Sequence, residues 1–361
     1  MRINTLSANP KYVKIKKDDY DGAIDIIGKI AFADGKIHLR DVNETGMDLY
    51  QAEKGDLVTS KINIHQGAVA IAERKLVSST HYQVYEIDRT QILPEYLVIA
   101  LRSKQFQDRI NEVKNNGIKN EQGADFLKSQ EIPLPSLEEQ GKIVCQIENQ
   151  KAIIEGAEKI LSNYVIPSEL FNAKEGRKAY LMSDVCKFTG GSQPPKEDFI
   201  HEGKEGYVRL VQIRDFKSDD FITYVPQNSV TKFFKEDDIM IARYGPPLFQ
   251  ILKGMSGAYN VALMKAIPNE ELVLKDYWFY YLQNPVIQEF VIDSSQRTAG
   301  QSGVNLDHLY TFQVFLPNKE VQKNIVRDLD TQMKVLEGIK KMRANSEQTI
   351  IEILTDMWGM G

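Results

Sequence analysis

The sequence predicts an α+β fold in which two related modules of mixed α and β structure are each followed by a long coiled-coil helix. Three observations lead to this prediction: a repeat of half of the chain, two long heptad patterns, and short strand-like and helix-like segments before each pattern. The chain has 361 residues, of which 42% are hydrophobic and 26% charged, as in ordinary globular proteins. At about 150 residues per domain, this length suits two domains.

The repeat is visible in three matched segments. Residues 134–144 (LPSLEEQGKIV) match residues 316–326 (LPNKEVQKNIV) at an offset of 182. The same offset pairs 55–58 with 237–240, and an offset of 181 pairs 93–97 with 274–278. Three matches in the same order and at near-constant spacing predict an internally duplicated scaffold.

Each copy ends in a pattern typical of a coiled-coil helix, expected over 136–166 and 318–357. Apolar residues recur in alternating steps of three and four after Pro135 and Pro317, and Pro167 is expected to end the first helix. The span from Lys319 to Met357 is 39 residues, or about 58 Å of helix. A helix packed on a globular core is the alternative, but a seam this narrow and long favours a coiled coil. The predicted seam and partner-docking positions are Ile143, Ile147, Gln150, Ile154, Leu161, Ile325, Leu329, Gln332, Leu336, Ile339, Ile350 and Ile353.

The modules before these helices read as mixed α and β structure. Strands are expected over 57–60, 81–87, 206–213 and 239–242. Helices with an apolar face are expected over 94–113 and 275–291. Four aromatic residues of the second helix have the spacing of a core face: Tyr277, Trp278, Tyr280 and Tyr281.

The patterns of common enzymes are missing from the sequence. No glycine-rich segment has the spacing of a phosphate-binding loop, and the 5 histidines show no metal-ligand spacing. The 2 cysteines favour a reducing cytoplasm, and no apolar run reaches the ~20 residues that cross a bilayer. We therefore expect a cytoplasmic, non-catalytic protein with no metal and no membrane contact.

The duplicated segment Leu-Pro-x-x-Glu-x-Gln-x-x-Ile-Val, followed each time by a heptad helix, resembles the specificity subunit of type I restriction–modification enzymes. The resemblance implies two target-recognition domains related by a pseudo-twofold axis, with the two helices antiparallel between them. On this sequence the recognition domains fall on 1–132 and 179–316, the first helix with its linker on 133–178, and the second helix on 317–361. The first module departs from the second, because it shows no counterpart to residues 180–185.

The resemblance also implies function and partners. The chain is expected to recognise a bipartite target in double-stranded DNA for DNA methylation and phage defence. Two methylation subunits are expected to dock on the helices, together with restriction or translocase subunits where these exist. No cofactor is expected in this chain, and S-adenosylmethionine is expected on the methylation subunit.

The net charge is −5, and none of the four segments 1–132, 133–178, 179–316 and 317–361 has an excess of basic residues. Partner subunits are therefore expected to supply much of the affinity for DNA phosphates. Base contacts are then expected from polar, glycine-flanked loops, since Arg, Lys, Asn and Gln recognise base edges. Ordinary solvated loops are the alternative for each position. The predicted DNA-binding residues are Lys61, Asn63, His65, Gln66, Lys119, Asn120, Gln122, Ser192, Gln193, Arg243, Tyr244, Gln296, Arg297, Thr298 and Gln301.

Two other functions remain open from the sequence. One is a coiled-coil scaffold whose modules bind protein or carbohydrate. The other is the detached specificity part of a single-chain restriction–methylation enzyme.

Overall fold

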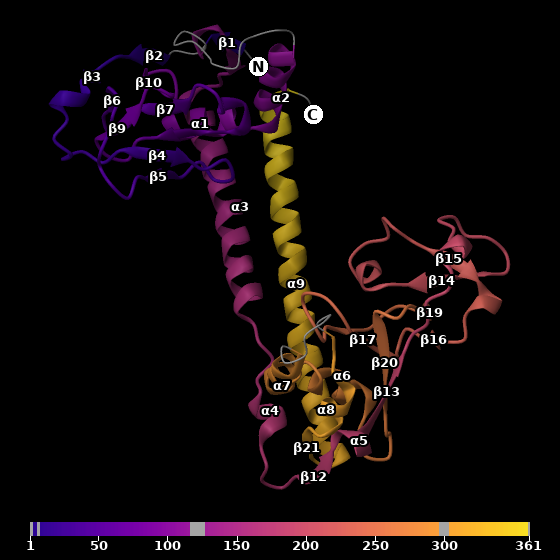
Figure 1. Ribbon diagram of the computed structural model, residues 1–361. Helices are drawn as coiled ribbons and strands as arrows, with labels where there is room; N and C mark the ends of the chain where they lie inside the picture. The colour runs from indigo at the N-terminus through magenta and orange to yellow at the C-terminus, as the bar shows by residue number, and fades with distance from the viewer. Residues whose placement is uncertain (1–2, 6–7, 116–126, 296–302, 360–361) are drawn as a thin grey trace. The chain divides into compact units, whose positions relative to one another are not determined.

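The computed structural model describes residues 3–5, 8–115, 127–295 and 303–359 (Figure 1). The chain divides into two compact units. Unit 1 comprises residues 1–162 together with 338–361, and unit 2 comprises residues 163–337. Helix α9 (Lys319–Met357) contributes residues to both units.

Unit 1 is built on a four-stranded antiparallel sheet with the order β2-β10-β7-β8. A three-stranded sheet (β3-β6-β9) and two strand pairs (β4-β5 and β1-β11) complete its β structure. The strands are β1 (Ile3–Thr5), β2 (Ala8–Lys11), β3 (Lys14–Ile15), β4 (Ile27–Ile30), β5 (Ile37–Leu39), β6 (Leu49–Ala52), β7 (Leu57–Ser60), β8 (Val69–Ile71), β9 (Leu76–Ser79), β10 (Tyr82–Ile87) and β11 (Glu131–Pro133). The helices are α1 (Pro94–Arg102), α2 (Lys104–Asn115) and α3 (Leu137–Asn163), with short 3-10 turns η1 (Lys17–Asp19), η2 (Ile64–Gln66) and η3 (Leu127–Ser129).

The core of unit 1 lies between its central sheet and the helix pair α1 and α2. All four residues of β7 are buried, which explains why this short segment reads as a strand. Tyr96 and Leu97 of α1 are fully buried in the same cluster as Leu57. The end of α9 closes this core, because Met357 and Trp358 belong to the cluster as well.

Unit 2 contains a second four-stranded antiparallel sheet, with the order β13-β20-β17-β18. Beside it lie the pair β12-β21 and the sheet β15-β14-β19-β16, in which β14 and β19 run parallel. The strands are β12 (Lys178–Leu181), β13 (Cys186–Gly190), β14 (Tyr207–Val211), β15 (Tyr224–Pro226), β16 (Phe233–Phe234), β17 (Ile239–Ala242), β18 (Ile251–Leu252), β19 (Gly257–Tyr259), β20 (Leu263–Pro268) and β21 (Gln313–Leu316). The helices are α4 (Glu169–Asn172), α5 (Met182–Val185), α6 (Lys275–Tyr281), α7 (Pro285–Ser295) and α8 (Leu306–Tyr310), with 3-10 turns η4 (Lys196–Asp198), η5 (Ile213–Phe216) and η6 (Gln227–Ser229).

The aromatic face of α6 forms the centre of the core in unit 2. The predicted core role of its four aromatic side chains is confirmed, since each is at most 6% exposed. Trp278 stacks on Tyr281 with ring centroids 5.0 Å apart, and Phe171 of α4 meets Tyr281 edge-on at 5.5 Å. The first turns of α9 complete this core through Ile325 and Leu329.

The two long helices form where the heptad patterns predict them, and α9 spans the predicted 39 residues. The first helix ends at Asn163, three residues before the expected end at 166, and residues 164–166 before Pro167 are not helical. A capping box starts α3: Glu139 N–H donates to Ser136 Oγ at 3.3 Å, and Ser136 N–H donates to Glu139 Oε2 at 3.1 Å. At the start of α9, Val321 N–H donates to Asn318 Oδ1 at 3.0 Å.

The structure corrects one expectation about the first module. Its start does have a strand in the place of β12: β1 pairs antiparallel with β11, as β12 pairs with β21. Thr5 lies opposite Glu131, and Leu181 lies opposite Gln313. Glu131 and Gln313 are 182 positions apart, the offset of the repeat. The two opening strands share little sequence, because backbone hydrogen bonds make this pairing and tolerate many side chains. No helix in the described part of the chain is both long and apolar enough to cross a bilayer.

Candidate nucleic-acid interface

In each central sheet, antiparallel pairing brings three loops to one end. In unit 1, β2 and β7 both pair antiparallel with β10, so both end where β10 begins. In unit 2, β13 and β17 end where β20 begins, for the same reason. We call this end the loop end of each sheet. It comprises residues 12–13, 61–66 and 81 in unit 1, and residues 191–193, 243–244 and 260–262 in unit 2.

Lys61 lies at the loop end of unit 1, directly after β7. Its backbone N–H donates to the His81 carbonyl at 2.9 Å, which joins the loops before β10 and after β7. Its Nζ lies 5.8 Å from the centroid of the Tyr50 ring. Tyr12, after β2, meets Tyr50 edge-on at 6.5 Å and is 58% exposed. Lys61 therefore stands beside the Tyr50 ring, which the exposed Tyr12 ring contacts in turn.

The next three predicted residues lie at the tight turn η2, with Asn63 directly before it and His65 and Gln66 within it. Asn63 and His65 are half-buried and Gln66 is exposed. Asn63 N–H donates to Ser60 Oγ at 3.1 Å, and Gln66 N–H donates to the Asn63 carbonyl at 3.0 Å. Gly67 ends the turn with a φ of 82°, a conformation that favours glycine. These bonds hold the loop in one conformation close to the sheet.

The corresponding loop of unit 2 passes very close to the backbone before β20. A Cβ on Gly191 would lie 2.1 Å from the Asn260 carbonyl oxygen, so only glycine fits here. Ser192 N–H donates to the Tyr259 carbonyl at 3.1 Å. Ser192 is half-buried, with an Oγ that has no hydrogen-bond partner among the described residues, and Gln193 is exposed.

Arg243 follows β17 in the same way as Lys61 follows β7. Its N–H donates to the Ala262 carbonyl at 2.8 Å, and its guanidinium carbon lies 5.4 Å from the centroid of the Tyr244 ring. Tyr244 pairs with Gly303 as an isolated antiparallel bridge. A Cβ on Gly190 would lie 3.5 Å from Arg243 Nη1, which places the guanidinium over the end of β13. The structure thus brings Arg243 and Tyr244 together with the loop that carries Ser192 and Gln193.

The remaining predicted contacts lie outside the described residues: Lys119, Asn120, Gln122, Gln296, Arg297, Thr298 and Gln301. Three further residues at or beside this loop end were not predicted as site residues: Tyr12 and His81 in its loops, and Tyr50 in β6. Tyr12 lies in the loop between β2 and β3, and the pairing of β3 with β6 brings it to Tyr50. Only the exposed tyrosine directly after a short strand could have drawn attention to this place.

A buried glutamine attaches the sheet and helices of unit 1 to α3. Gln140 is 0% exposed, and its Oε1 accepts the Leu93 N–H at 2.8 Å. Its Nε2 donates to the carbonyls of Gln91 at 3.0 Å and Pro135 at 2.9 Å. All three bonds go to backbone groups, so this side chain fixes the start of α1 against the start of α3.

The same arrangement recurs in unit 2. Gln322 is 0% exposed, accepts the Leu274 N–H at 2.8 Å, and donates to the carbonyls of Leu272 at 3.1 Å and Pro317 at 2.9 Å. Each of these residues lies 181 or 182 positions after its counterpart in unit 1. The glutamine of the repeated motif therefore has one structural role in both units.

An aspartate before each central strand is also repeated. Asp56 Oδ2 accepts the Glu53 N–H at 2.7 Å and pairs with Lys11 Nζ at 2.9 Å. Asp238 accepts the Lys235 N–H at 2.9 Å and pairs with Lys265 at 3.2 Å and Lys275 at 2.9 Å.

These bonds shift the ionisation of the unit 2 groups. Burial alone would raise the pKa of Asp238, but the Lys235 N–H and the two ammonium groups outweigh it and lower the pKa. For Lys275, burial would lower the pKa, and hydrogen bonds to Asp237 and Asp238 raise it.

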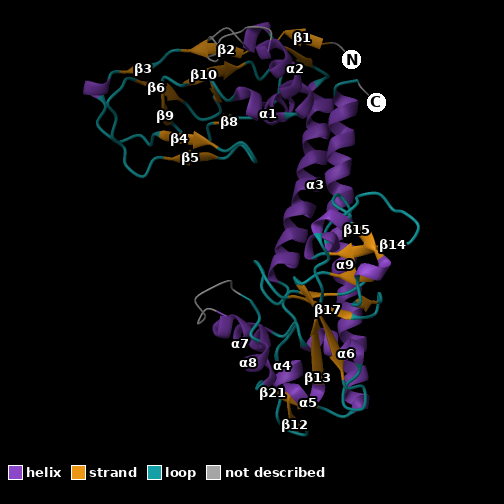
Figure 2. Cartoon of the chain, turned by 45° about the vertical axis from the view of Figure 1, so that its right-hand side comes forward, coloured by secondary structure: helices purple, strands orange, loops and turns teal. Residues whose placement is uncertain are grey.

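All predicted seam residues of the two helices are buried or half-buried. Within unit 1, Ile147 is 2% exposed and Ser346 of α9 is 4% exposed, and Arg343 Nη2 lies 3.0 Å from Glu158 Oε1 of α3. Figure 2 draws this part of α9 beside α3. Within unit 2, the Tyr164 hydroxyl donates to Gln332 Oε1 at 2.8 Å. Ile325 and Leu329 pack instead into the core of unit 2, so that part of the predicted seam attaches the helix to its module.

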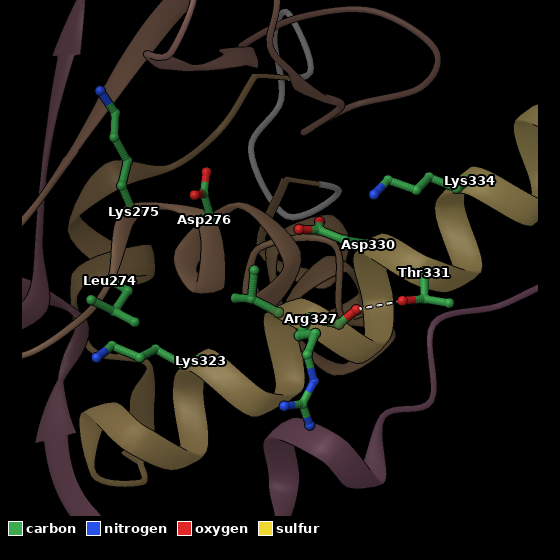
Figure 3. A pocket seen from close by; sticks show the side chains of 9 residues that line it. Leu274, Lys275, Asp276, Lys323, Arg327, Asp330, Thr331 and Lys334 are labelled. Atoms are coloured by element: carbon green, nitrogen blue, oxygen red, sulfur yellow. Dashed lines mark hydrogen bonds between the residues drawn. The ribbon is translucent and has the colours of Figure 1, made fainter.

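A cavity of about 410 Å³ lies between α6 and α9 in unit 2 (Figure 3). Its lining carries four cations and two carboxylates, and most of these charges are already paired. Lys275 is held by Asp237 and Asp238, and Asp276 pairs with Lys253 at 2.6 Å. Asp330 accepts the Tyr280 hydroxyl at 2.6 Å. The charged residues of α6 in this lining thus pair with residues outside α9, and the Tyr280–Asp330 hydrogen bond joins α6 to α9.

The loop ends carry polar and aromatic side chains. Across the described residues, no group of three His, Cys, Asp or Glu side chains is placed to hold a metal ion. The loop ends offer hydrogen-bond donors, acceptors and aromatic rings on well-defined turns, the groups that contact nucleic-acid bases and phosphates.

A family model described as the type I restriction modification DNA specificity domain matches residues 7–162 and again residues 175–346. The chain belongs to this family. The two matched stretches cover most of unit 1 and most of unit 2, so the specificity-domain family accounts for both units.

Curated relatives carry the same description. The chain is 27% identical over 266 residues to the type I restriction enzyme MjaIX specificity subunit of Methanocaldococcus jannaschii, a match covering 65% of this chain and 61% of that protein. The match thus spans about three-fifths of that relative's length. A putative type I restriction enzyme MjaX specificity subunit from the same organism is 22% identical over 358 residues, covering 88% of this chain and 80% of that protein.

Solved structures share the fold of this chain. A chain from a study of complex assembly and conformational transition of the type I R-M system superposes with a TM-score of 0.61 at 17% identity, covering 99% of this chain and 94% of that one. The type I restriction–modification S subunit from M. genitalium superposes with a TM-score of 0.55 at 15% identity, covering 99% and 96%. The predicted mixed α and β fold with two domains and a long C-terminal helix is therefore confirmed.

Proposed function

We propose that this chain is the DNA sequence-recognition subunit of a type I restriction–modification complex and recognises a two-part DNA target. The observation that carries the proposal is the double match to the specificity domain, once in each unit. Each unit presents a loop end with a basic residue, amide side chains and a tyrosine. Residues 1–132 and 179–316 would each bind one half-site.

The long helices are proposed to act as the spacer, over 133–178 and 317–361. The ion pair between Arg343 and Glu158 and the joint packing of Ile143 and Leu354 on the core of unit 1 support an antiparallel coiled coil there. The equal strand orders of the two modules support their duplication, and a pseudo-twofold relation between them is part of the proposal. The helices would also dock two methylation subunits, and restriction or translocase subunits where these exist.

Catalysis is assigned to those partners. The methylation subunit would bind S-adenosylmethionine, and this chain would supply the target site in the cytoplasm. Unit charges close to neutrality support this division of roles, because a lone DNA-binding protein needs a basic surface for counterion release.

The test is co-expression of the chain with the methyltransferase subunit of a neighbouring gene, followed by methylation sequencing of the host genome. We expect one new methylated motif with two specific parts and an unspecified spacer of fixed length. An assembled complex that adds no sequence-specific methylation would contradict the proposal.

Inserting four residues after Gly156 and after Gly338 tests the spacer separately. These glycines lie at equivalent positions, 182 residues apart, and their surroundings are open. Four residues add about 6 Å of helix, close to two base pairs of DNA. We expect the spacer of the methylated motif to lengthen while both half-sites keep their sequences; an unchanged spacer would contradict the role of the helices.

A further inference from the structure

A cation backed by a tyrosine ring occupies the same position at the loop end of each unit. Lys61 is the first residue after β7 and Arg243 the first after β17, and they lie 182 positions apart, the offset of the repeat. The cationic groups lie 5.8 Å and 5.4 Å from the ring centroids of Tyr50 and Tyr244. A cation held over an aromatic face is attracted by the ring and loses less freedom when it binds.

Neither ring-backed cation forms an ion pair with another described residue. Two other lysines of the same sheets are engaged: Lys11 pairs with Asp56 at 2.9 Å, and Lys265 pairs with Asp238 at 3.2 Å. By contrast, the ring-backed cations have no carboxylate partner among the described residues, so their charges can serve an acceptor on a ligand.

In unit 1 the ring that backs the cation is itself held in place. Tyr12 packs edge-on against Tyr50 at 6.5 Å and remains 58% exposed at the surface. In unit 2, Tyr244 is anchored by its bridge to Gly303, where a Cβ would approach the ring to 2.7 Å. Each loop end therefore presents its cation on a fixed aromatic support.

Lysine and arginine side chains only donate hydrogen bonds. Guanine is the base that offers two neighbouring acceptors, O6 and N7, in the major groove, whereas adenine places a donor beside its N7. We propose that Lys61 and Arg243 each recognise one guanine, each in the half-site bound by its own unit. Tyr50 and Tyr244 are the positioning residues. This inference rests on the proposed function and adds the base that each unit recognises.

The experiment selects duplexes from a randomised DNA library with the full chain in complex with its methylation subunit. Lys61→Gln should remove the preference for G·C at one position of one half-site and weaken binding of the wild-type site about ten- to a hundredfold. Arg243→Gln should do the same at one position of the other half-site. In each variant the untouched half-site keeps its preference, which shows that the chain is folded and assembled.

Conservative variants separate the cation from the fold. Lys61→Arg keeps a donor at the same place and should retain the guanine preference. Tyr50→Phe keeps the ring and should also retain it, whereas Tyr50→Leu should lower that preference several-fold without changing the other half-site. Loss of the preference in Tyr50→Phe, or its full retention in Tyr50→Leu, would overturn the positioning role.

Matched controls come from exposed lysines before the same strands, at the opposite end of each sheet. Lys54→Gln and Lys235→Gln should leave the base preferences unchanged. If Lys61→Gln or Arg243→Gln weakens all sequences equally and makes the salt dependence shallower by about one phosphate contact, the cations bind phosphate and the inference is wrong. If Lys61→Gln and Arg243→Gln both retain the wild-type base preferences, the inference is wrong while the proposed function still stands. A wild-type complex without any sequence preference overturns the proposed function together with it.

Discussion

The central sheets of units 1 and 2 have the same strand order, and both are attached to a long helix by one fully buried glutamine. The layers built beside these sheets differ. Unit 1 adds a three-stranded antiparallel sheet and a hairpin, whereas unit 2 adds a four-stranded sheet with one parallel pair. The attachment to the helices is therefore the same in both units, while the layers beside the central sheets differ.

The units also differ in how their helical layer is closed. In unit 1, Trp358 Nε1–H donates to Ser103 Oγ at 3.0 Å at the junction of α1 and α2. In unit 2, the corresponding junction of α6 and α7 contacts α4, the helix that follows α3. There Asn284 Nδ2 donates to Asn172 Oδ1 at 2.8 Å. Ser103 and Asn284 are 181 positions apart, so one junction is closed by two different partners.

The largest effect is expected from substitutions that remove the side chains packed at these two junctions. Trp358→Ala should destabilise unit 1, and Phe171→Ala unit 2, each by about 3–5 kcal/mol, because both rings are buried in their cores. Hydrogen exchange resolved by mass spectrometry should show faster exchange in α1 and α2 for the first variant, and in α6 and α7 for the second. Equal loss of protection in both units after either change would show that the closures are not specific to their units.

The next effect concerns the glutamine that the units share. Gln140→Ala and Gln322→Ala each remove three hydrogen bonds that a fully buried side chain makes to the backbone, and each should cost about 3 kcal/mol. Urea unfolding can follow the two units separately, because Trp358 reports on unit 1 and Trp278 on unit 2. Gln348→Ala, on the exposed face of α9, is the control and should stay within about 0.5 kcal/mol of the wild type. A near-neutral result for Gln322→Ala alone would mean that the repeated bonds are not energetically equivalent.

The smallest effect is acid dependence in unit 2. The lowered pKa of Asp238 means that its ionised form stabilises the fold above its ordinary pKa of 3.8, and that this contribution is lost as the pH falls through the lower folded value. Asp238→Asn should cost about 1–2 kcal/mol at pH 7 and flatten the loss of stability below about pH 4. Unfolding at pH 3 to 7 followed by Trp278 fluorescence would measure this. If the variant loses stability with falling pH as steeply as the wild type does, other carboxylates cause that loss.

Much of the scaffold could be predicted because its signals are local. The heptad steps located both helices to within a few residues, and the short apolar runs located β7 and β17. The opening strand β1 could not be predicted, because its place depends on backbone pairing with β11, more than a hundred residues away in the chain. The seam positions Ile325 and Leu329 have heptad spacing and yet pack into the core of unit 2, since periodicity shows which face of a helix is apolar and not what covers it.

The candidate interface shows the same division. Lys61, Arg243 and Tyr244 follow strands that the sequence reveals, so their placement in surface loops could be expected from the chain alone. The contacts of Tyr50 with Lys61 and Tyr12 come only from the tertiary structure, because the pairing of β3 with β6 brings together residues that are far apart in the sequence. Local periodicity and the repeat determined the scaffold; non-local strand pairing decided which side chains share each loop end.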